Sequence, residues 1–460
     1  MRSNTGTNLH QPTPRTTLQT PSNPGTRYSH YSKPIVPLDL VEYIIDELRH
    51  DRAALQACNL TSRLWSHRAR THLHRTLTIE HINAALISDK KCSHHQMLDD
   101  LPVILKYADE VRLKGVLYAE PRDENLCGAQ FWSTIDRLRH VRRVCMINTD
   151  LTCTSFRHFD SFNPRFWGRM FPAVENLSLI DTKFLDSLGP LLLASEFPRL
   201  QVLTLKDVKA GPVVASLSDT KEATGLNALA PRSVRISCHD QPQLVCEMLR
   251  HVRALRAASD TLEVLRLSTA LGIEESIELA TFFHEAETNL RDLHLVLQQH
   301  PDHTPFLSNM RVEVLKRVSW CIENCEGLDI LRLGFRRHPT YSMLSVLYGH
   351  KKDSLDTVWQ VWGEILRGLT KVSFRKLIFY VDARDIDNRE ALEDVLLTQS
   401  PLQSIEVIYF YVGGHFVSPL RMQHSVDKWT GAVRRLQSQF VVQLEFYHKP
   451  EIVREGWYIW

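Results

Sequence analysis

The stretch Leu262-Glu263-Val264-Leu265-Arg266-Leu267 carries a pattern that recurs along most of the chain. Apolar residues stand at its first, fourth and sixth positions, and a polar residue separates the last two. Counting weaker and degenerate copies, the central apolar residue recurs at positions 111, 144, 177, 203, 234, 265, 293, 331, 377, 405 and 444. The mean step of about 33 residues is typical of a protein built from structural repeats.

Each copy predicts a short β-strand, because its apolar and polar residues alternate. Amphipathic helices are expected between the strands, with apolar stripes in segments 244–255, 315–325 and 355–369. A helix followed by a strand, repeated, implies parallel strands. Two architectures fit this order: a sheet covered by helices on both faces, or a solenoid with helices on one face.

The residue between the last two apolar positions decides between these architectures. It is usually polar, as at Arg112, Ser178, Thr204, Arg235, Arg266, His294, Arg332, Glu406 and Glu445. A parallel strand buried on both faces would be almost continuously apolar. We therefore expect an α/β fold in which one face of a parallel sheet packs on helices and the other meets solvent.

This expected fold resembles a leucine-rich-repeat solenoid. The mean step exceeds the roughly 20–29 residues of regular repeats of that kind, so the resemblance implies an irregular arc with extra loops. The solenoid is expected over residues 80–460, after a disordered tail at 1–34 and a small helical domain at 35–79. The tail is rich in Pro, Ser, Thr and Asn and nearly free of aliphatic residues, a composition that cannot bury a core.

The helical domain begins with one apolar stripe, formed by Pro37, Leu40, Val41, Ile44, Ile45 and Leu48. Pro37 suits a first helical turn, because its missing N–H would have no partner there. A second helix carries Leu55 and Leu60, and a third begins near Trp65. Three short helices bury little surface alone, so the stripe is expected to need a partner surface.

The same residues resemble the F-box motif in their order and spacing. The chain has Val36-Pro37-x-Asp39-Leu40-Val41-x-x-Ile44, then Leu55-x-x-Cys58-x-Leu60-x-Ser62-Arg63-x-Trp65. It departs from the usual pattern at Val36 for Leu, Asp39 for Glu, and Leu60-Thr61 before the Ser. With the repeats behind it, the chain resembles the F-box/leucine-rich-repeat proteins of fungi.

The resemblance implies that the helical domain docks on the Skp-type adaptor of a cullin–RING ubiquitin ligase and that the repeats bind a protein substrate. Carried over by position, the docking residues are Pro37, Leu40, Val41, Ile44, Ile45, Leu55, Leu60 and Trp65. The alternative is that these residues form the core of their own domain or pack on the repeats.

A second candidate site lies on the solvent face of the predicted sheet. Arg235, Arg266, His294 and Arg332 occupy equivalent positions in four consecutive repeats. Arginine side chains suit carboxylates and phosphates, so we predict that a substrate presents an acidic or phosphorylated segment here. The alternative is an ordinary solvated face with Asp and Glu as counter-charges.

Composition argues against several classes of protein. The 460 residues hold 55 Lys and Arg against 53 Asp and Glu, a net charge of +2, which disfavours a protein held on nucleic acid or on a membrane by bulk charge. No apolar run is long enough to cross a membrane, and no signal peptide is recognisable. Nine scattered cysteines indicate free thiols and a cytoplasmic or nuclear location.

Sequence signatures of catalysis and of cofactor binding are missing. The sequence contains no phosphate-binding glycine loop and no hydrolase or metalloprotease motif. Cys92, His94 and His95, and separately Cys321 and Cys325, have the right chemistry for zinc but no converging set of four ligands. We therefore expect a protein that is not an enzyme and has no cofactor or metal. It would be either a ligase adaptor or a repeat scaffold whose F-box does not enter a ligase.

Overall fold

A computed structural model of the 460-residue chain gives the fold. It describes residues 36–80, 105–115, 138–152, 166–211, 229–238, 242–254, 261–269, 273–285, 289–298, 309–336, 358–382, 389–414 and 419–448. The chain divides into two compact units, Met1–Ala69 and Arg70–Trp460. The sequence instead placed boundaries after 34 and 79, and the predicted disordered tail at 1–34 lies outside the described residues.

The first unit is helical. Its elements are α1 (Leu38–Glu47), η1 (Leu48–His50), α2 (Arg52–Thr61) and α3 (Arg63–Leu73), the last of which continues past the unit boundary. Asp51 begins α2, because its Oδ1 accepts a hydrogen bond from the Ala54 N–H at 3.0 Å. Arg68 donates two hydrogen bonds to the carboxylate of Asp46, at 2.6 and 2.5 Å, and so ties α3 to α1.

The second unit is dominated by one parallel sheet. In the part of the chain that the structure describes, it has twelve strands, and each strand pairs with the sheet strands nearest to it in sequence. The strands are β1 (Thr76–Glu80), β2 (Glu110–Lys114), β3 (Arg143–Ile147), β5 (Asn176–Ile180), β7 (Val202–Lys206), β9 (Ser233–Ser237), β10 (Val264–Thr269), β11 (Asp292–Gln298), β12 (Ile330–Arg336), β13 (Lys376–Asp382), β14 (Val407–Gly414) and β15 (Val441–His448).

The strand register follows the repeat pattern of the sequence. Leu265 aligns with Val234 on one side and with Leu293 on the other, and Leu293 aligns in turn with Leu331. These four side chains are all buried. The predicted central apolar positions from 111 to 377 therefore form one continuous row in the core, as expected.

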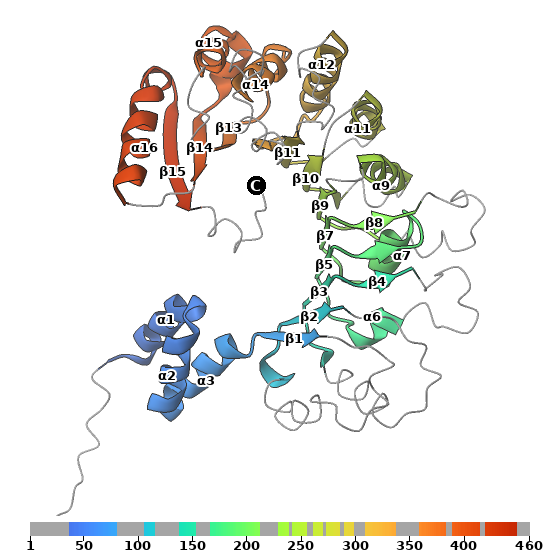
Figure 1. Ribbon diagram of the computed structural model, residues 1–460, viewed down its shortest axis with the longest axis vertical. Coiled ribbons are helices and arrows are strands. Elements are labelled where there is room, and N and C mark those ends of the chain that lie inside the picture. The colour runs from blue at the N-terminus through green and yellow to red at the C-terminus, as the bar shows by residue number, and fades with distance from the viewer. Residues whose placement is uncertain are drawn as a thin grey trace, which may run out of the picture. The chain divides into compact units, whose positions relative to one another are not determined.

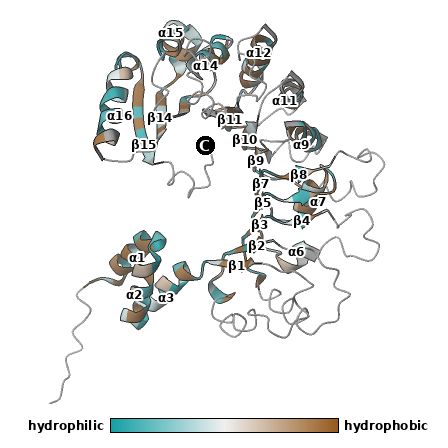
Figure 2. Ribbon diagram, in the orientation of Figure 1, coloured by the Kyte–Doolittle hydropathy of each residue, from teal (hydrophilic) through white to brown (hydrophobic). Residues whose placement is uncertain are grey.

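Helices lie along one face of this sheet, as Figure 1 shows. They are α6 (Phe166–Met170), α7 (Gly189–Ser195), α9 (Pro242–Ala254), α11 (Ile273–Glu285), α12 (Asn309–Glu323), α14 (Val358–Arg367), α15 (Glu390–Thr398) and α16 (Pro419–Ala432), with 3-10 turns η6 (Ser400–Ser404) and η7 (Leu436–Ser438). Hydrophobic and hydrophilic residues are interleaved on both strands and helices (Figure 2). The second unit is thus an α/β fold of solenoid type. No described helix is both long and apolar enough to cross a membrane.

Residues in the left-handed backbone region end several strands in the first half of the sheet. Asn148, Asp181 and Asp207 have φ of 50°, 50° and 48°, and Gly115 has φ of 61°. Each directly follows its strand, and each donates its N–H to a carbonyl at the end of the next strand. The turned chain then forms a second, three-stranded parallel sheet from β4 (Asp150–Leu151), β6 (Lys183–Phe184) and β8 (Lys209–Ala210).

Two sequence-based strand positions were wrong, and one strand-like segment joins the sheet. Leu77–Ile79, placed at the end of the helical domain as a strand-like segment, forms part of β1, where Leu77 aligns with Val111. The copy centred on Ile405 is shifted by three residues, because Leu377 aligns with Ile408. Residues Ser400–Ser404, where the strand was expected to begin, form a 3-10 turn instead.

The copy centred on Leu444 is shifted by two residues, because Ile408 aligns with Val442. A shift of two keeps the same side chains on the same face, whereas the shift of three around residue 405 exchanges the faces. Glu406, predicted to face solvent within the sheet, precedes β14, and Tyr409 takes its place in the row.

Aromatic side chains fill the core between the sheet and α14 and α16. Trp359 contacts Trp362, Phe410 and Trp429, with ring centroids 5.6, 6.3 and 5.8 Å apart. All four side chains are almost fully buried. Trp359 and Trp362 belong to the apolar stripe expected in the segment 355–369, and their burial agrees with that expectation.

Candidate functional site

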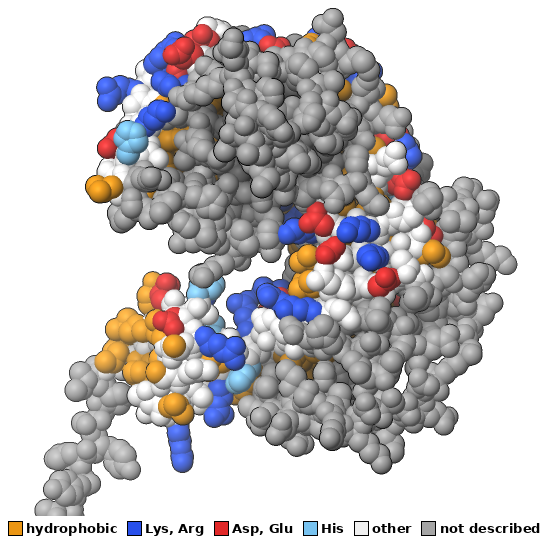
Figure 3. Space-filling model, viewed as in Figure 1, with side chains coloured by type: hydrophobic (Ala, Val, Ile, Leu, Met, Phe, Trp, Pro, Cys, Tyr) orange, Lys and Arg blue, Asp and Glu red, His pale blue; other side chains and the backbone are white. Residues whose placement is uncertain are grey.

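The helical unit exposes an unusual amount of apolar surface. Seven of the thirteen large exposed hydrophobic residues in the described chain belong to it, and we call them the apolar face: Val36, Leu38, Leu40, Tyr43, Ile44, Leu60 and Leu64. Figure 3 shows orange side chains gathered over α1. Single exposed hydrophobic residues are ordinary, whereas large exposed apolar patches are typical of interaction surfaces.

Helical spacing explains how α1 has both an inner and an outer apolar side. Val41 and Ile45 are four residues apart and point inward, with 7% and 1% of their surface exposed. Leu40 and Ile44 have the same spacing one position earlier and point outward, with 49% and 48% exposed. Tyr43 is exposed between them.

The eight predicted docking residues therefore separate into groups. Pro37, Leu40, Ile44 and Leu60 are exposed, and Trp65 is half-buried. Val41, Ile45 and Leu55 are instead core residues of the unit, because three short helices need their few large aliphatic side chains to hold together.

Sequence reasoning missed Val36, Leu38, Tyr43 and Leu64. The position of Tyr43, three residues after Leu40, was the available signal for one of them.

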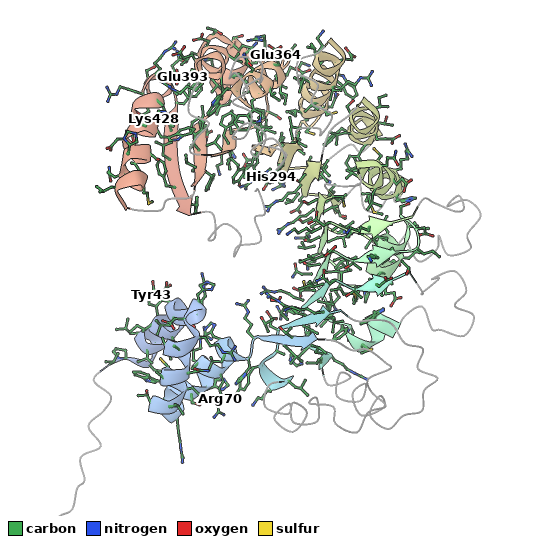
Figure 4. The ribbon with its side chains drawn as sticks, in the orientation of Figure 1. Tyr43, Arg70, His294, Glu364, Glu393 and Lys428 are labelled. Carbon is green, nitrogen blue, oxygen red and sulfur yellow. The ribbon has the colours of Figure 1, made fainter. Side chains whose placement is uncertain are left out.

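The second candidate site lies on the face of the sheet opposite the helices. Arg235 aligns with Arg266, Arg266 with His294, and His294 with Arg332, on strands β9 to β12. We call these four residues the arginine row. Figure 4 labels His294 at β11. The predicted equivalence of the four positions is confirmed. Because neighbouring strands lie about 4.8 Å apart, the backbones of successive members are about that far apart across the sheet.

Asp292, on the same face of β11, organises the arginine row. Arg332 Nε donates to both carboxylate oxygens of Asp292, at 2.8 and 3.1 Å, and a guanidinium nitrogen of Arg266 lies 3.8 Å from the same carboxylate. Arg332 Nη1 also donates to the hydroxyl of Tyr380 at 3.3 Å. A counter-charge is therefore present, as the alternative interpretation of this face expected.

His294 differs from its prediction as a solvent-facing residue, since only 5% of its surface is exposed. Its ring stacks on Tyr380, with centroids 5.0 Å apart and planes inclined by 27°. Burial, and then the charges of Arg266, Arg332 and Arg235, hold the pKa of His294 well below its usual 6.5. His294 is therefore neutral near pH 7.

The arginines differ in how strongly they hold their charge. Burial, and then the neighbouring charge of Arg235, lowers the pKa of Arg266 to about 10. Burial also lowers the pKa of Arg235. Burial opposes the charged form of Arg332 as well, but its hydrogen bond to Asp292 and the nearby Tyr380 and Asp292 outweigh burial and raise its pKa. All three guanidinium groups are charged at neutral pH.

A row of stacked tyrosines continues from the arginine row across β13 to β15. Tyr380 stacks on Tyr411 with centroids 5.2 Å apart, and Tyr411 stacks on Tyr447 at 5.5 Å. Ile378 and Tyr380 are buried on this face, which is therefore only partly open to solvent. Sequence reasoning missed this tyrosine row because the misplaced strand near 405 put Tyr409 and Tyr411 in the wrong register.

The cysteine pair considered for zinc is part of the core. Cys321 and Cys325 are fully buried free thiols, and burial raises the pKa of Cys321 above its usual range. Cys92, His94 and His95 lie outside the described residues. Within the ranges that the structure describes, no three His, Cys, Asp or Glu side chains converge as a metal site.

Comparison with known proteins gives no family assignment. No family model matches the chain, and no curated protein matches it. Eleven solved chains match, among them a crystal structure of a protein from Bacteroides fragilis. That protein is 9% identical to this chain, with a TM-score of 0.25, over 80% of this chain and 70% of its own.

Proposed function

We propose that this chain is a substrate-recognition adaptor of an SCF-type cullin–RING ubiquitin ligase. In this proposal the helical unit is an F-box that docks on a Skp-type adaptor, and the solenoid is a leucine-rich-repeat array that binds a protein substrate. The observation that carries the proposal is the apolar face, because its seven exposed hydrophobic residues coincide with the segment that resembles the F-box motif.

The chemistry of the apolar face supports a protein partner. Leu40, Tyr43 and Ile44 form a helical ridge at i, i+3 and i+4, a spacing with which one helix enters a groove of another protein. These side chains are already about half covered, so burying the rest contributes about half of the roughly 1.5–3 kcal/mol of a fully exposed side chain, before the costs of association. Pro37 is the N-cap residue of α1, and its carbonyl accepts hydrogen bonds from the N–H groups of Leu40 and Val41.

The mechanism proposed for the chain is proximity rather than catalysis. An adaptor with two binding surfaces raises the effective concentration of its substrate near the conjugating enzyme. Partners in the complex would catalyse ubiquitin transfer. This chain would supply only the two surfaces, the apolar face on the helical unit and a substrate surface on the solenoid.

Co-purification from cells tests the proposal. Tagged full-length chain should retain both a Skp-type adaptor and a cullin, and the double variant Pro37→Ala, Ile44→Glu should lose both, because a carboxylate in the desolvated centre of the interface is strongly unfavourable. Leu420→Glu is the matched control, because Leu420 on α16 is equally apolar and 83% exposed. It should retain both partners.

The second candidate function is a repeat scaffold that does not take part in degradation. Its F-box would bind the adaptor without entering a ligase, or would bind nothing. Adaptor without cullin in the co-purification favours the scaffold. Retention of neither protein by the unaltered chain contradicts the ligase proposal.

A further inference from the structure

The last strand of the large sheet leaves its end of the core open. β15 ends the strand order, and among the described residues no strand pairs with its outer edge (Figure 1). At the opposite end, Leu77 and Ile79 of β1 are buried. Val442 and Leu444, which continue the apolar row onto β15, are only half-buried. The core is therefore covered at the first strand and uncovered at the last one.

The helix before β15 is open at the same end of the sheet. None of the side chains from Met422 to Lys428 is buried, whereas Trp429, the next residue of α16, is almost fully buried. Met422, Val426 and Trp429 share one side of the helix, at i, i+4 and i+7. The apolar stripe of α16 thus runs out of the core into a stretch that the described residues leave uncovered.

The outer edge of β15 has none of the usual features that discourage strand pairing. Edge strands are commonly kept short, bulged or charged, or they contain proline. β15 aligns with β14 over all eight of its residues without a bulge, and it contains no Lys, Arg or Pro. Its one acidic residue is Glu445. Such an edge is suited to pairing with a further strand.

The backbone of β15 restricts how an identical strand can pair with it. Val441 donates its N–H to the carbonyl of Glu406, next to β14. Successive residues direct their backbone groups to opposite sides, so Leu444 directs its own toward the open edge. In an antiparallel pair, such a residue must lie opposite another of the same kind. A two-fold axis therefore passes through one residue, and the longest overlaps have it at Gln443, Leu444 or Glu445.

Side-chain pairing selects one of these three axes. An axis at Glu445 places the carboxylates of the two copies opposite each other, which is unfavourable. An axis at Gln443 shortens the overlap of the two strands. An axis at Leu444 places Leu444 opposite Leu444 of the second copy, Val442 opposite Phe446, and Gln443 opposite Glu445. Apolar side chains then meet on the core face, and no like charges are opposed.

We propose that β15 pairs in antiparallel fashion with β15 of a second copy of this chain, about a two-fold axis at Leu444. The pairing joins the large sheets of the two copies and brings their uncovered apolar rows side by side. It concerns the second unit alone, and it goes beyond the proposed ligase function without depending on it.

The residues that follow β15 match its edge less well than a second copy does. Arg454 and Glu455 are adjacent, so on any strand one of them would face the apolar row. A short hairpin after His448 would place that charge against Leu444 or Phe446. A charge desolvated there is strongly unfavourable. A second β15 places no charged side chain on that face.

Sedimentation velocity of the purified full-length chain over a series of concentrations tests the proposal. The unaltered chain should form a dimer. Gln443→Glu creates two like-charge pairs with Glu445 across the axis and should raise the dimer dissociation constant about threefold or more, whereas Gln443→Lys should lower it by a similar factor. Gln443 is exposed, so neither change should unfold the chain. The matched controls are Gln201→Glu and Gln201→Lys, at an exposed residue beside β7 in the middle of the sheet, and should change nothing.

Opposite shifts for the two Gln443 variants, diminished at high salt, support the proposed axis. The proposal is overturned if the unaltered chain is monomeric at every concentration, or if both Gln443 variants shift the dissociation constant in the same direction or not at all. It is also overturned if a chain lacking residues 449–460 dimerises and the unaltered chain does not, because those residues would then cover the edge of β15.

Discussion

The surroundings of His294 keep this residue of the arginine row uncharged near neutral pH. The groups around it are Arg235 on β9, Arg266 on β10, Asp292 on its own strand, Arg332 on β12 and Tyr380 on β13. Burial, with the arginine charges, keeps the pKa of His294 well below 6.5, so this imidazole contributes no charge near neutral pH.

Glu196 is a second residue whose environment opposes its charge. Burial raises its pKa from 4.5 to about 8, although the N–H groups of Trp167 and Gly168 at the start of α6 donate to its carboxylate. Between pH 4.5 and 8 the unfolded chain releases this proton and the folded chain keeps it, so stability falls as pH rises through that window.

Glu196→Gln should remove this loss while keeping an acceptor for the Trp167 N–H. Each unit of pKa difference corresponds to about 1.4 kcal/mol. The Tm of the variant minus that of the unaltered chain should therefore be larger at pH 8 than at pH 5, by about 2 °C or more. Thermal unfolding at both pH values measures the gain. The same difference in Tm between the two proteins at pH 5 and at pH 8 would show that Glu196 is solvated.

At the scale of one element, the buried and exposed sides of α1 should respond differently to substitution. Ile45→Ala should destabilise the helical unit by about 2–5 kcal/mol, because the buried side chain leaves a cavity. Ile44→Ala, at the adjacent exposed position, should change stability by no more than about 0.5 kcal/mol. Hydrogen exchange of α1 to α3 distinguishes them. Faster exchange in both variants would contradict the two-sided helix.

The strands also show which parts of the fold the sequence patterns predict correctly. Strands from β2 to β13 were located correctly, because their two inward apolar residues are fixed by the sheet alternation. The strand β14 was misplaced, since Leu402, Ile405 and Val407 have the same spacing where a 3-10 turn leads into the strand. The buried state of His294 could not be predicted, because it depends on Tyr380 arriving from a strand far along the chain.

The candidate sites were predictable to different extents. The equivalent positions of the arginine row follow from the repeat, but Asp292 as their organiser depends on side-chain geometry that alternation does not specify. On α1, the pattern marks Leu40, Val41, Ile44 and Ile45 alike as apolar. Only the packing of α2 and α3 decides which two become core and which two stay exposed.

At the scale of the whole molecule, the order of strands in the large sheet predicts that the stability of each repeat depends on its neighbours and little on distant repeats. Each strand of the second unit pairs only with its sequence neighbours in that sheet among the described residues. Stability in such arrays is a sum of repeat and nearest-neighbour terms. Damage at one end should therefore propagate weakly to the other.

Trp362→Ala tests this locality, because Trp362 is fully buried against Phe379 with centroids 4.9 Å apart. The change should cost about 3–5 kcal/mol locally and accelerate hydrogen exchange in β13 and β14. Exchange in β2 to β5 should remain close to that of the unaltered chain. Equal acceleration throughout the sheet would indicate one cooperative unit and contradict the expectation.

Titration of purified Skp-type adaptor into purified full-length chain measures whether the apolar face of the helical unit binds that adaptor, as we propose. We expect saturable one-to-one binding that weakens at least a hundredfold in Leu40→Glu, Ile44→Glu and is unchanged in Leu420→Glu. Absence of binding by the unaltered chain, or equal affinity in the double variant, would contradict it.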